Sequence, residues 1–143
     1  MEKTAIDDVE NERNPMKVHS VRKPVSRVLG TTDFAMNYFE LEPGESFSGG
    51  LHAHGDQEEV FYVEEGTAEF EVGVDRETTE VSGGELVRFP PGQFQKGYNA
   101  GDDTLVGWAL GAPGSTHDWD ELVSRVHCPE CGEERTHDTD LVG

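Results

Sequence analysis

The sequence predicts an all-β fold, an antiparallel sandwich or barrel, in a single domain of 143 residues. Two observations support this prediction. Short runs with strand-like patterning recur along the chain, and turn residues separate them without an intervening helix. The clearest run is 68–72, where Ala68, Phe70 and Val72 alternate with two glutamates. Strict alternation places the three apolar side chains on the inner face and the glutamates in water.

The expected strands follow one another from residue 33 to residue 110. The first is the aromatic-rich stretch 33–41, which ends at the turn Glu-Pro-Gly-Glu at 42–45. Pro90 and Pro91 end another strand, since proline cannot donate a hydrogen bond to a neighbouring strand. The remaining strands are expected around 51–54 and at 60–63, 68–72, 78–81, 86–89 and 104–110. We therefore assign residues 1–29 to a polar N-terminal arm with a first strand, and 30–112 to the barrel.

The chain changes character after residue 112. Trp119, Leu122, Val123 and Val126 recur at helical spacing behind a Ser115 that resembles a helix cap. We expect a short amphipathic helix over residues 113–126, packed on the outside of the barrel.

The tail 127–143 carries the second candidate site. Cys128 and Cys131 enclose Pro-Glu and are followed by glycine, and this pattern resembles a zinc knuckle, in which a tight turn presents two thiolates to one ion. Tetrahedral zinc needs two more ligands, which His127, His137, His117 or a second subunit could supply. A redox dithiol and a pair of inert thiols are the alternative interpretations.

The first candidate site is built on His52, His54 and Glu59. Side chains alternate along a strand, so His52 and His54 project from the same face. Glu59 is five residues beyond His54, and the turn at Gly55 and Asp56 allows the chain to re-enter with Glu59 pointing inward. Glu58 is the competing carboxylate, and we expect it to face outward. Two imidazoles and one carboxylate suit a divalent first-row metal; iron, manganese, nickel and zinc all remain open.

These residues belong to two motifs that together resemble the cupin family over residues 30–112. In the first motif, the family's His-x-His, Glu and Gly correspond to His52, His54, Glu59 and Gly66. The second motif matches at Gly84, Pro90, Gly92 and Asn99. The resemblance implies a jelly-roll β-barrel with a metal site inside it. It implies nothing about the substrate.

Gln95 stands where the family pattern has its third histidine. An amide oxygen is a weaker donor than imidazole, so Gln95 is expected either to bind the ion loosely or to hold a metal-bound water. Loss of the metal site, with the barrel retained, is the alternative. The aromatic residues Phe47, Phe61, Phe94, Tyr98 and Trp108 could line a substrate cavity, but we expect most of them to belong to the core.

Composition excludes several partners. The formal net charge is -19, with 30 acidic and 11 basic residues, so the surface does not suit nucleic acid or an anionic membrane. Acidity spread along the whole chain favours a halophilic, salt-accumulating cytoplasm, and an ordinary acidic soluble protein is the alternative. No apolar run at the N-terminus is long enough for a signal peptide, and two cysteines do not form a secreted disulfide scaffold. A cytoplasmic homodimer is expected.

Two classes of function fit the sequence. The first is a metal-dependent enzyme, resembling an oxidoreductase, a dioxygenase or an isomerase, whose open coordination positions take a small organic substrate. The second is a module that binds or senses a small ligand without converting it.

Overall fold

The computed structural model describes residues 1–12, 18–114, 122–127 and 134–138, the last two ranges by the course of their backbone. Its helices are η1 (Ile6–Asp8) and α1 (Val25–Leu29). Its strands are β1 (Val21–Lys23), β2 (Ala35–Leu41), β3 (Leu51–His54), β4 (Glu58–Glu65), β5 (Thr67–Val72), β6 (Glu77–Ser82), β7 (Leu86–Phe89), β8 (Gln95–Asn99), β9 (Leu105–Ala112), β10 (Leu122–His127) and β11 (Glu134–Asp138).

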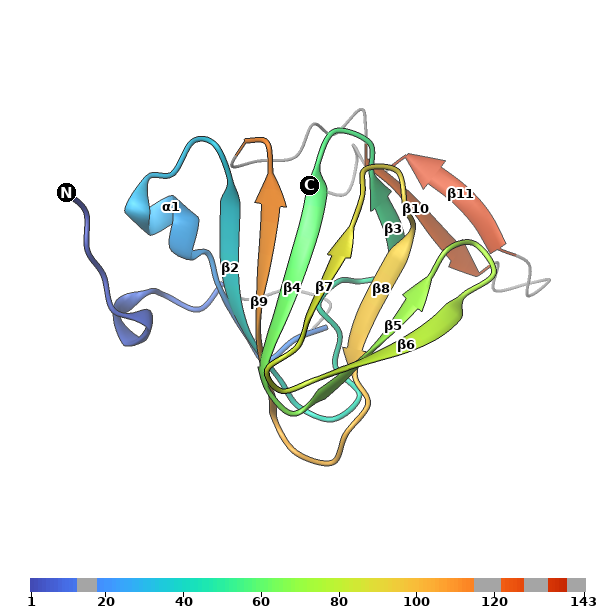
Figure 1. Cartoon of the computed structure of the whole chain (residues 1–143), viewed down its shortest axis with the longest axis horizontal. Helices are drawn as coiled ribbons and strands as arrows, with labels where there is room; N and C mark the ends of the chain where they lie inside the picture. The colour runs from blue at the N-terminus through green and yellow to red at the C-terminus, as the bar shows by residue number, and fades with distance from the viewer. Residues whose placement is uncertain (13–17, 115–121, 128–133, 139–143) are drawn as a thin grey trace.

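The strands form two sheets that enclose the core (Figure 1). One sheet has the order β1-β2-β9-β4-β7 and the other β11-β10-β3-β8-β5-β6. Neighbouring strands in both sheets pair antiparallel. The turn at Gly66 carries the chain from β4 in the first sheet to β5 in the second, with a φ of 88° that favours glycine. The predicted all-β antiparallel fold is confirmed.

Aromatic residues fill the space between the sheets. Phe61 and Val63 of β4 face Ala68 and Phe70 of β5, and all four are at most 3% exposed. Val72 packs against the same cluster from the rim, so the three residues expected on the inner face of β5 are confirmed there. The Phe47 ring lies 5.0 Å from both the Phe39 and the Phe61 rings. Close packing of this kind is worth about 0.5–1.5 kcal/mol per aromatic pair beyond area burial.

The N-terminal arm packs on the outside of the first sheet. Val9, next to η1, is 3% exposed and clusters with Val25 of α1 and Tyr38 of β2. Trp108 of β9 packs against this second cluster instead of lining a cavity. The arm therefore carries apolar anchors as well as polar residues. Among the residues that the structure describes, no helix is long and apolar enough to cross a membrane.

The prediction of a helix over residues 113–126 is wrong for the end of that range, from residue 122 on. Leu122–His127 form β10, which pairs antiparallel with β3 and with β11. The edge of β3 that faces away from β8 offers unpaired backbone groups, and pairing with β10 satisfies them. Strand pairing therefore outweighs the helical spacing of the apolar residues. Residues 115–121 lie outside the described part of the chain.

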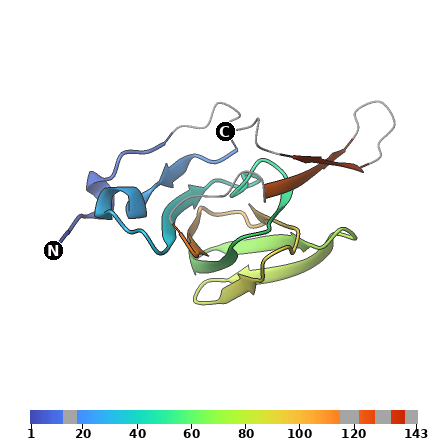
Figure 2. The same cartoon turned by 90° about the horizontal axis from the view of Figure 1, so that it is seen from above.

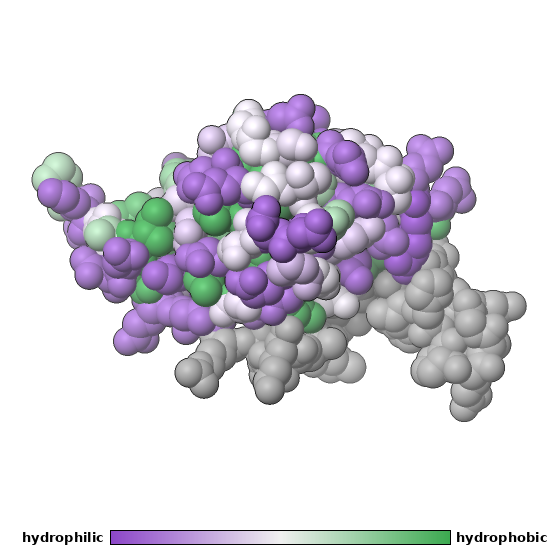
Figure 3. All heavy atoms as spheres, turned by 90° about the horizontal axis from the view of Figure 1, so that it is seen from below, coloured by the Kyte–Doolittle hydropathy of each residue, from purple (hydrophilic) through white to green (hydrophobic). Residues whose placement is uncertain are grey.

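The charge of the surface gives a prediction about salt. Most of the coloured residues on the face shown in Figure 3 are hydrophilic. The chain has a net charge of -19, so folding brings like charges together. Salt at 1 M shortens the screening length to about 3 Å and weakens this repulsion. We expect the melting temperature to rise by roughly 4 °C or more between 0.05 and 1 M KCl, which corresponds to about 1 kcal/mol. Scanning calorimetry measures the shift. Sucrose of equal osmolality is the control, since an equal rise in sucrose would rule out charge screening as the cause.

Candidate metal centre

Two strands and the turn between them position the predicted metal ligands. His52 and His54 lie two residues apart on β3, and Glu59 follows at the start of β4. The ligand atoms of the three side chains all lie within 4.8 Å of one another. His54 Nε2 is 3.8 Å from Glu59 Oε2, and the two imidazole rings stand edge to face at 5.0 Å. The convergence predicted from the His52, His54 and Glu59 spacing is confirmed.

Glu58 and Glu59 separate to opposite faces of β4. The side chain of Glu59 is 16% exposed and faces the histidines. The side chain of Glu58 is 48% exposed, and its Oε1 accepts a 2.6 Å hydrogen bond from Arg88 Nε on β7. Glu59 is therefore the carboxylate of the site, as expected.

Gln95 joins the site from β8, where it is the residue paired with His52. The side chain is 2% exposed, and its Nε2 donates a 2.7 Å hydrogen bond to Glu59 Oε1. The same nitrogen lies 3.4 Å from His52 Nε2. Gln95 Oε1 is buried and accepts no hydrogen bond from the described residues. Because the two ends of an amide exchange by a half-turn, Gln95 can hold Glu59 in place or offer an oxygen to an ion.

Burial makes the carboxylate of Glu59 costly to ionise. Desolvation raises the pKa of Glu59 to about 7, while the hydrogen bond from Gln95 lowers it. A divalent cation beside the carboxylate would remove this desolvation cost. Two imidazoles, one buried carboxylate and a buried amide oxygen form a donor set that fits a first-row transition metal.

The comparison of the sequence with protein families agrees with this geometry. Residues 37–108 match the cupin domain family, and this range contains His52, His54, Glu59 and Gln95. The chain belongs to the cupin family. No protein of curated function matches it significantly.

Solved structures show the cupin fold again. The polyketide cyclase RemF from Streptomyces resistomycificus is 23% identical, with a TM-score of 0.71 over 91% of this chain and 88% of that one. A sugar phosphate isomerase from Silicibacter pomeroyi is 20% identical, with a TM-score of 0.68 over 97% and 94%. Oxalate decarboxylase from Lactobacillus farciminis is 19% identical, with a TM-score of 0.65 over 82% of this chain and 34% of that one. At these identities the likeness establishes the fold alone.

Backbone contacts in this cupin orient the His52 ring and hold the end of β3 that carries His54. His52 Nδ1 lies 3.0 Å from the Gly50 carbonyl, which leaves Nε2 toward the site. The backbone N–H of Gly92 donates a 2.7 Å hydrogen bond to the His54 carbonyl. The second motif therefore supports the first through the Pro90-Pro91-Gly92 turn.

Gln57 is a buried residue next to the candidate site that sequence reasoning missed. It lies in the turn between His54 and Glu59 and is 3% exposed. Its Nε2 donates to the carbonyls of Pro113 at 2.9 Å and Gly114 at 3.3 Å. The amide thus joins the metal-site turn to the segment that follows β9. A lone glutamine in a polar turn carries no sequence signal for this role.

The remaining candidates lie in the core, at the surface, in the C-terminal strands or outside the described residues. Phe47 and Phe61 belong to the core, as expected, whereas Phe94 and Tyr98 are partly exposed. Cys128, Cys131 and His117 lie outside the described residues. His127 ends β10 directly before the cysteine segment, and His137 of β11 pairs with Ser124.

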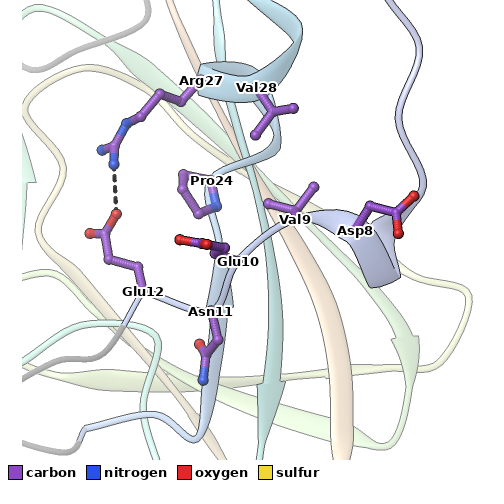
Figure 4. A pocket seen from close by; sticks show the side chains of 8 residues that line it. All are labelled: Asp8, Val9, Glu10, Asn11, Glu12, Pro24, Arg27 and Val28. Atoms are coloured by element: carbon purple, nitrogen blue, oxygen red, sulfur yellow. Dashed lines mark hydrogen bonds and ion pairs between the residues drawn. The ribbon is translucent and has the colours of Figure 1, made fainter.

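A surface hollow of about 430 Å³ lies away from the metal centre, between the N-terminal arm and α1 (Figure 4). An ion pair between Arg27 Nη1 and Glu12 Oε2, 2.8 Å long, spans one side of it. None of the predicted site residues lines this hollow. Its lining consists of Asp8, Val9, Glu10, Asn11, Glu12, Pro24, Arg27 and Val28.

Proposed function

We propose that this cupin binds a divalent transition metal through His52, His54 and Glu59. The convergence of their ligand atoms within 4.8 Å carries the proposal. Gln95 supports the site, since its side chain is buried beside Glu59 and His52. Three protein ligands leave coordination positions open for water and for a small molecule.

We further propose that a small organic substrate occupies these open positions and is converted there. The bound metal would act as a Lewis acid or as a redox centre. The chain's own residues hold the ligand side chains in place. The Gly50 carbonyl fixes the His52 ring, and the hydrogen bond from Gln95 fixes Glu59. An isomerase-like or dioxygenase-like reaction is consistent with this arrangement. The solved relatives include an isomerase, a cyclase and a decarboxylase, so fold does not select the reaction.

Ligand binding without turnover is the second candidate function. The observation that favours it is Gln95, which adds a neutral amide where a third imidazole would hold the ion more firmly. Oxygen uptake, together with mass spectrometry of candidate substrates, distinguishes the two functions. Turnover above the level of the metal-free protein excludes the pure binding module.

Metal content of the purified protein tests the proposal. Protein prepared without chelator or a nickel column should contain a transition metal, and the stripped protein should bind one Co²⁺ in the barrel with a visible d–d spectrum. Cys128→Ser with Cys131→Ser provides the background for this measurement, because it removes any contribution from the tail. A stripped barrel that binds no cobalt contradicts the proposal.

Gln95→His is expected to tighten metal binding. The imidazole adds a fourth strong ligand, so affinity for Co²⁺ should rise by about tenfold or more. The new ligand also occupies a position that water or substrate would use, so turnover or ligand binding should fall. Competitive titration against a chromophoric chelator measures the first effect. Gln93→His, two residues earlier on the same segment, is the control. An unchanged affinity in Gln95→His would show that this side chain does not reach the ion.

The tail is proposed to bind a structural zinc ion in a reducing cytoplasm. Cys128 and Cys131 supply two thiolates. The pairing of β10 with β11 favours His127 over His137 as a third ligand. The pair His127–Glu134 borders the cysteine segment, whereas His137 lies three residue pairs farther along the hairpin. Three pairs correspond to roughly 10 Å along a strand.

Removing the two thiols should remove this zinc alone. We expect Cys128→Ser with Cys131→Ser to lower zinc content by one ion per chain, while the melting temperature of the barrel stays within about 2 °C. Mass spectrometry under native conditions counts the ions. Zinc content equal to that of the wild type would refute the knuckle.

A further inference from the structure

The row of residues that contains Glu59 continues across the first sheet to β2. Glu59 of β4 is opposite Gly111 of β9, and Gly111 is opposite Ala35 of β2. Residues directly opposite each other in an antiparallel pair lie on the same face of the sheet. Ala35 and Gly111 therefore face the interior of the barrel beside the candidate metal centre.

Asn37 is the one polar residue among the inner-facing positions of β2. It lies two residues before Phe39, which belongs to the aromatic core, whereas Tyr38 between them packs on the outside. Asn37 is also opposite Ala109, which is in turn opposite Phe61 of the core. The side chain of Asn37 is thus directed into the barrel, one row away from the candidate metal ligand on β4.

The amide of Asn37 is available to a ligand. Its side chain is only partly buried, and it makes no hydrogen bond with the part of the chain that the structure describes. An amide offers two donor hydrogens and an acceptor oxygen. The other residues of β2 and β9 in the two rows nearest the metal centre are small, and they are Ala35, Ala109 and Gly111. Little side-chain volume therefore separates the amide from Glu59.

Other side chains close the two ends of this wall of small residues. At the metal end the carboxamide of Gln57 lies over Gly111, since a Cβ on Gly111 would be 3.6 Å from Gln57 Oε1. At the other end the His19 ring stands edge-on to the Phe39 ring at 5.6 Å. Asn37 lies between these two ends.

The basic side chain that β1 brings to this face is already paired. Figure 2 shows the N-terminal arm, β1 and α1, all drawn in blue, together at one side of the barrel. Arg22 of β1 is opposite Phe39, and its Nη1 is 2.7 Å from Glu12 Oε1. A guanidinium held by a carboxylate is a poor partner for a second anion. The group that meets Asn37 is therefore expected to be neutral.

We infer that Asn37 is a ligand-contacting residue of the metal site, and that the site takes a small monoanionic chelator with a neutral hydrogen-bonding tail. The inference rests on the metal binding proposed above and deepens it. A divalent ion bound by Glu59 retains one positive charge, which the anionic chelating group neutralises. Two strand spacings and two residues separate Asn37 from Glu59, so their Cα atoms are about 12 Å apart. A hydroxyl or carbonyl group at the far end of a short chain bonds the amide.

Three hydroxamates with the same five-carbon chain test the ligand class on the cobalt-loaded protein. Pentanohydroxamate ends in a methyl group, 5-hydroxypentanohydroxamate in a hydroxyl group and glutarate monohydroxamate in a carboxylate. The hydroxyl-tailed probe should bind about threefold to tenfold more tightly than the methyl-tailed probe, which is the gain from one hydrogen bond. The carboxylate-tailed probe should bind no more tightly than the methyl-tailed one. Titrations followed by cobalt absorption measure all three, in the background without the tail cysteines.

Variants at position 37 test the residue itself. Asn37→Ala should abolish the advantage of the hydroxyl tail and leave Co²⁺ affinity unchanged, which also shows that the barrel is intact. Met36→Ala is the matched control, because Met36 is opposite Leu110 on the outer face of the sheet. Asn37→Lys places a cation at the same position, so the carboxylate-tailed probe should become the tightest of the three, about tenfold tighter than with the wild type.

The outcomes separate this inference from the proposed function. If the wild-type barrel binds no Co²⁺, the metal site itself is wrong. If Co²⁺ binds but the hydroxyl tail gives no advantage, or if Asn37→Ala keeps that advantage, only the role of Asn37 is wrong. A wild-type preference for the carboxylate tail would overturn the neutral class of ligand. A loss of preference confined to Asn37→Ala supports the inference.

Discussion

Glu59→Ala is expected to reduce the affinity of the barrel for Co²⁺ by at least about a hundredfold, since it removes one of three ligands. His52→Ala should have a similar effect. The fold should persist in both, because neither side chain belongs to the aromatic core.

Glu58→Ala is the matched control for this experiment. It removes the adjacent carboxylate, which is exposed and paired with Arg88 on the outer side of β4. An exposed ion pair contributes about 0–1 kcal/mol, so neither stability nor metal affinity should change much. Isothermal titration with Co²⁺ compares the three variants in the background without the tail cysteines. Equal losses in Glu58→Ala and Glu59→Ala would contradict the assignment of Glu59 to the site.

The sequence predicted this cluster of candidate metal ligands because the relevant signals are local. His52 and His54 are separated by one residue in a strand, so alternation alone places them on one face. The distinction between Glu58 and Glu59 also follows from alternation, since Glu59 shares its face with Phe61 and Val63, which are buried in the core. Short-range periodicity was therefore sufficient for the two histidines and for the inner faces of β4 and β5, while the choice of Glu59 also used the turn at Gly55 and Asp56 and the match to the cupin motif.

Features that depend on distant contacts were not predictable in the same way. The role of Gln57 depends on carbonyls more than fifty residues later in the chain. β10 depends on the open edge of β3, and its apolar spacing also fits a helix, which is the alternative we expected. Val9 is buried only because β2 and α1 form a surface that receives it. In each case tertiary contacts, not local pattern, determine the outcome.

Gly97→Ala is expected to destabilise the barrel by about 3 kcal/mol, at the upper end of what overpacking a core costs. Gly97 lies in β8, two residues from Gln95, and faces the aromatic core. An added Cβ would lie 2.8 Å from Phe70 Cζ, closer still to Phe70 Cε1, and 2.9 Å from Phe47 Cδ2. Phe70 is fully buried, so its ring has no free space into which it can move. Chemical denaturation gives the change in unfolding free energy.

Two further variants isolate the steric cause. Gly101→Ala should change stability by less than about 0.5 kcal/mol, because its Cβ would meet only Asn99 Oδ1, at 3.5 Å. Phe70→Leu shortens the clashing side chain, so Gly97→Ala should cost at least about 1 kcal/mol less in that background than in the wild type. Additive losses in the double variant would mean that Phe70 does not set the limit at position 97. Because Gly97 and Gln95 share β8, the clash should also displace Gln95 from Glu59, and metal affinity should fall together with stability.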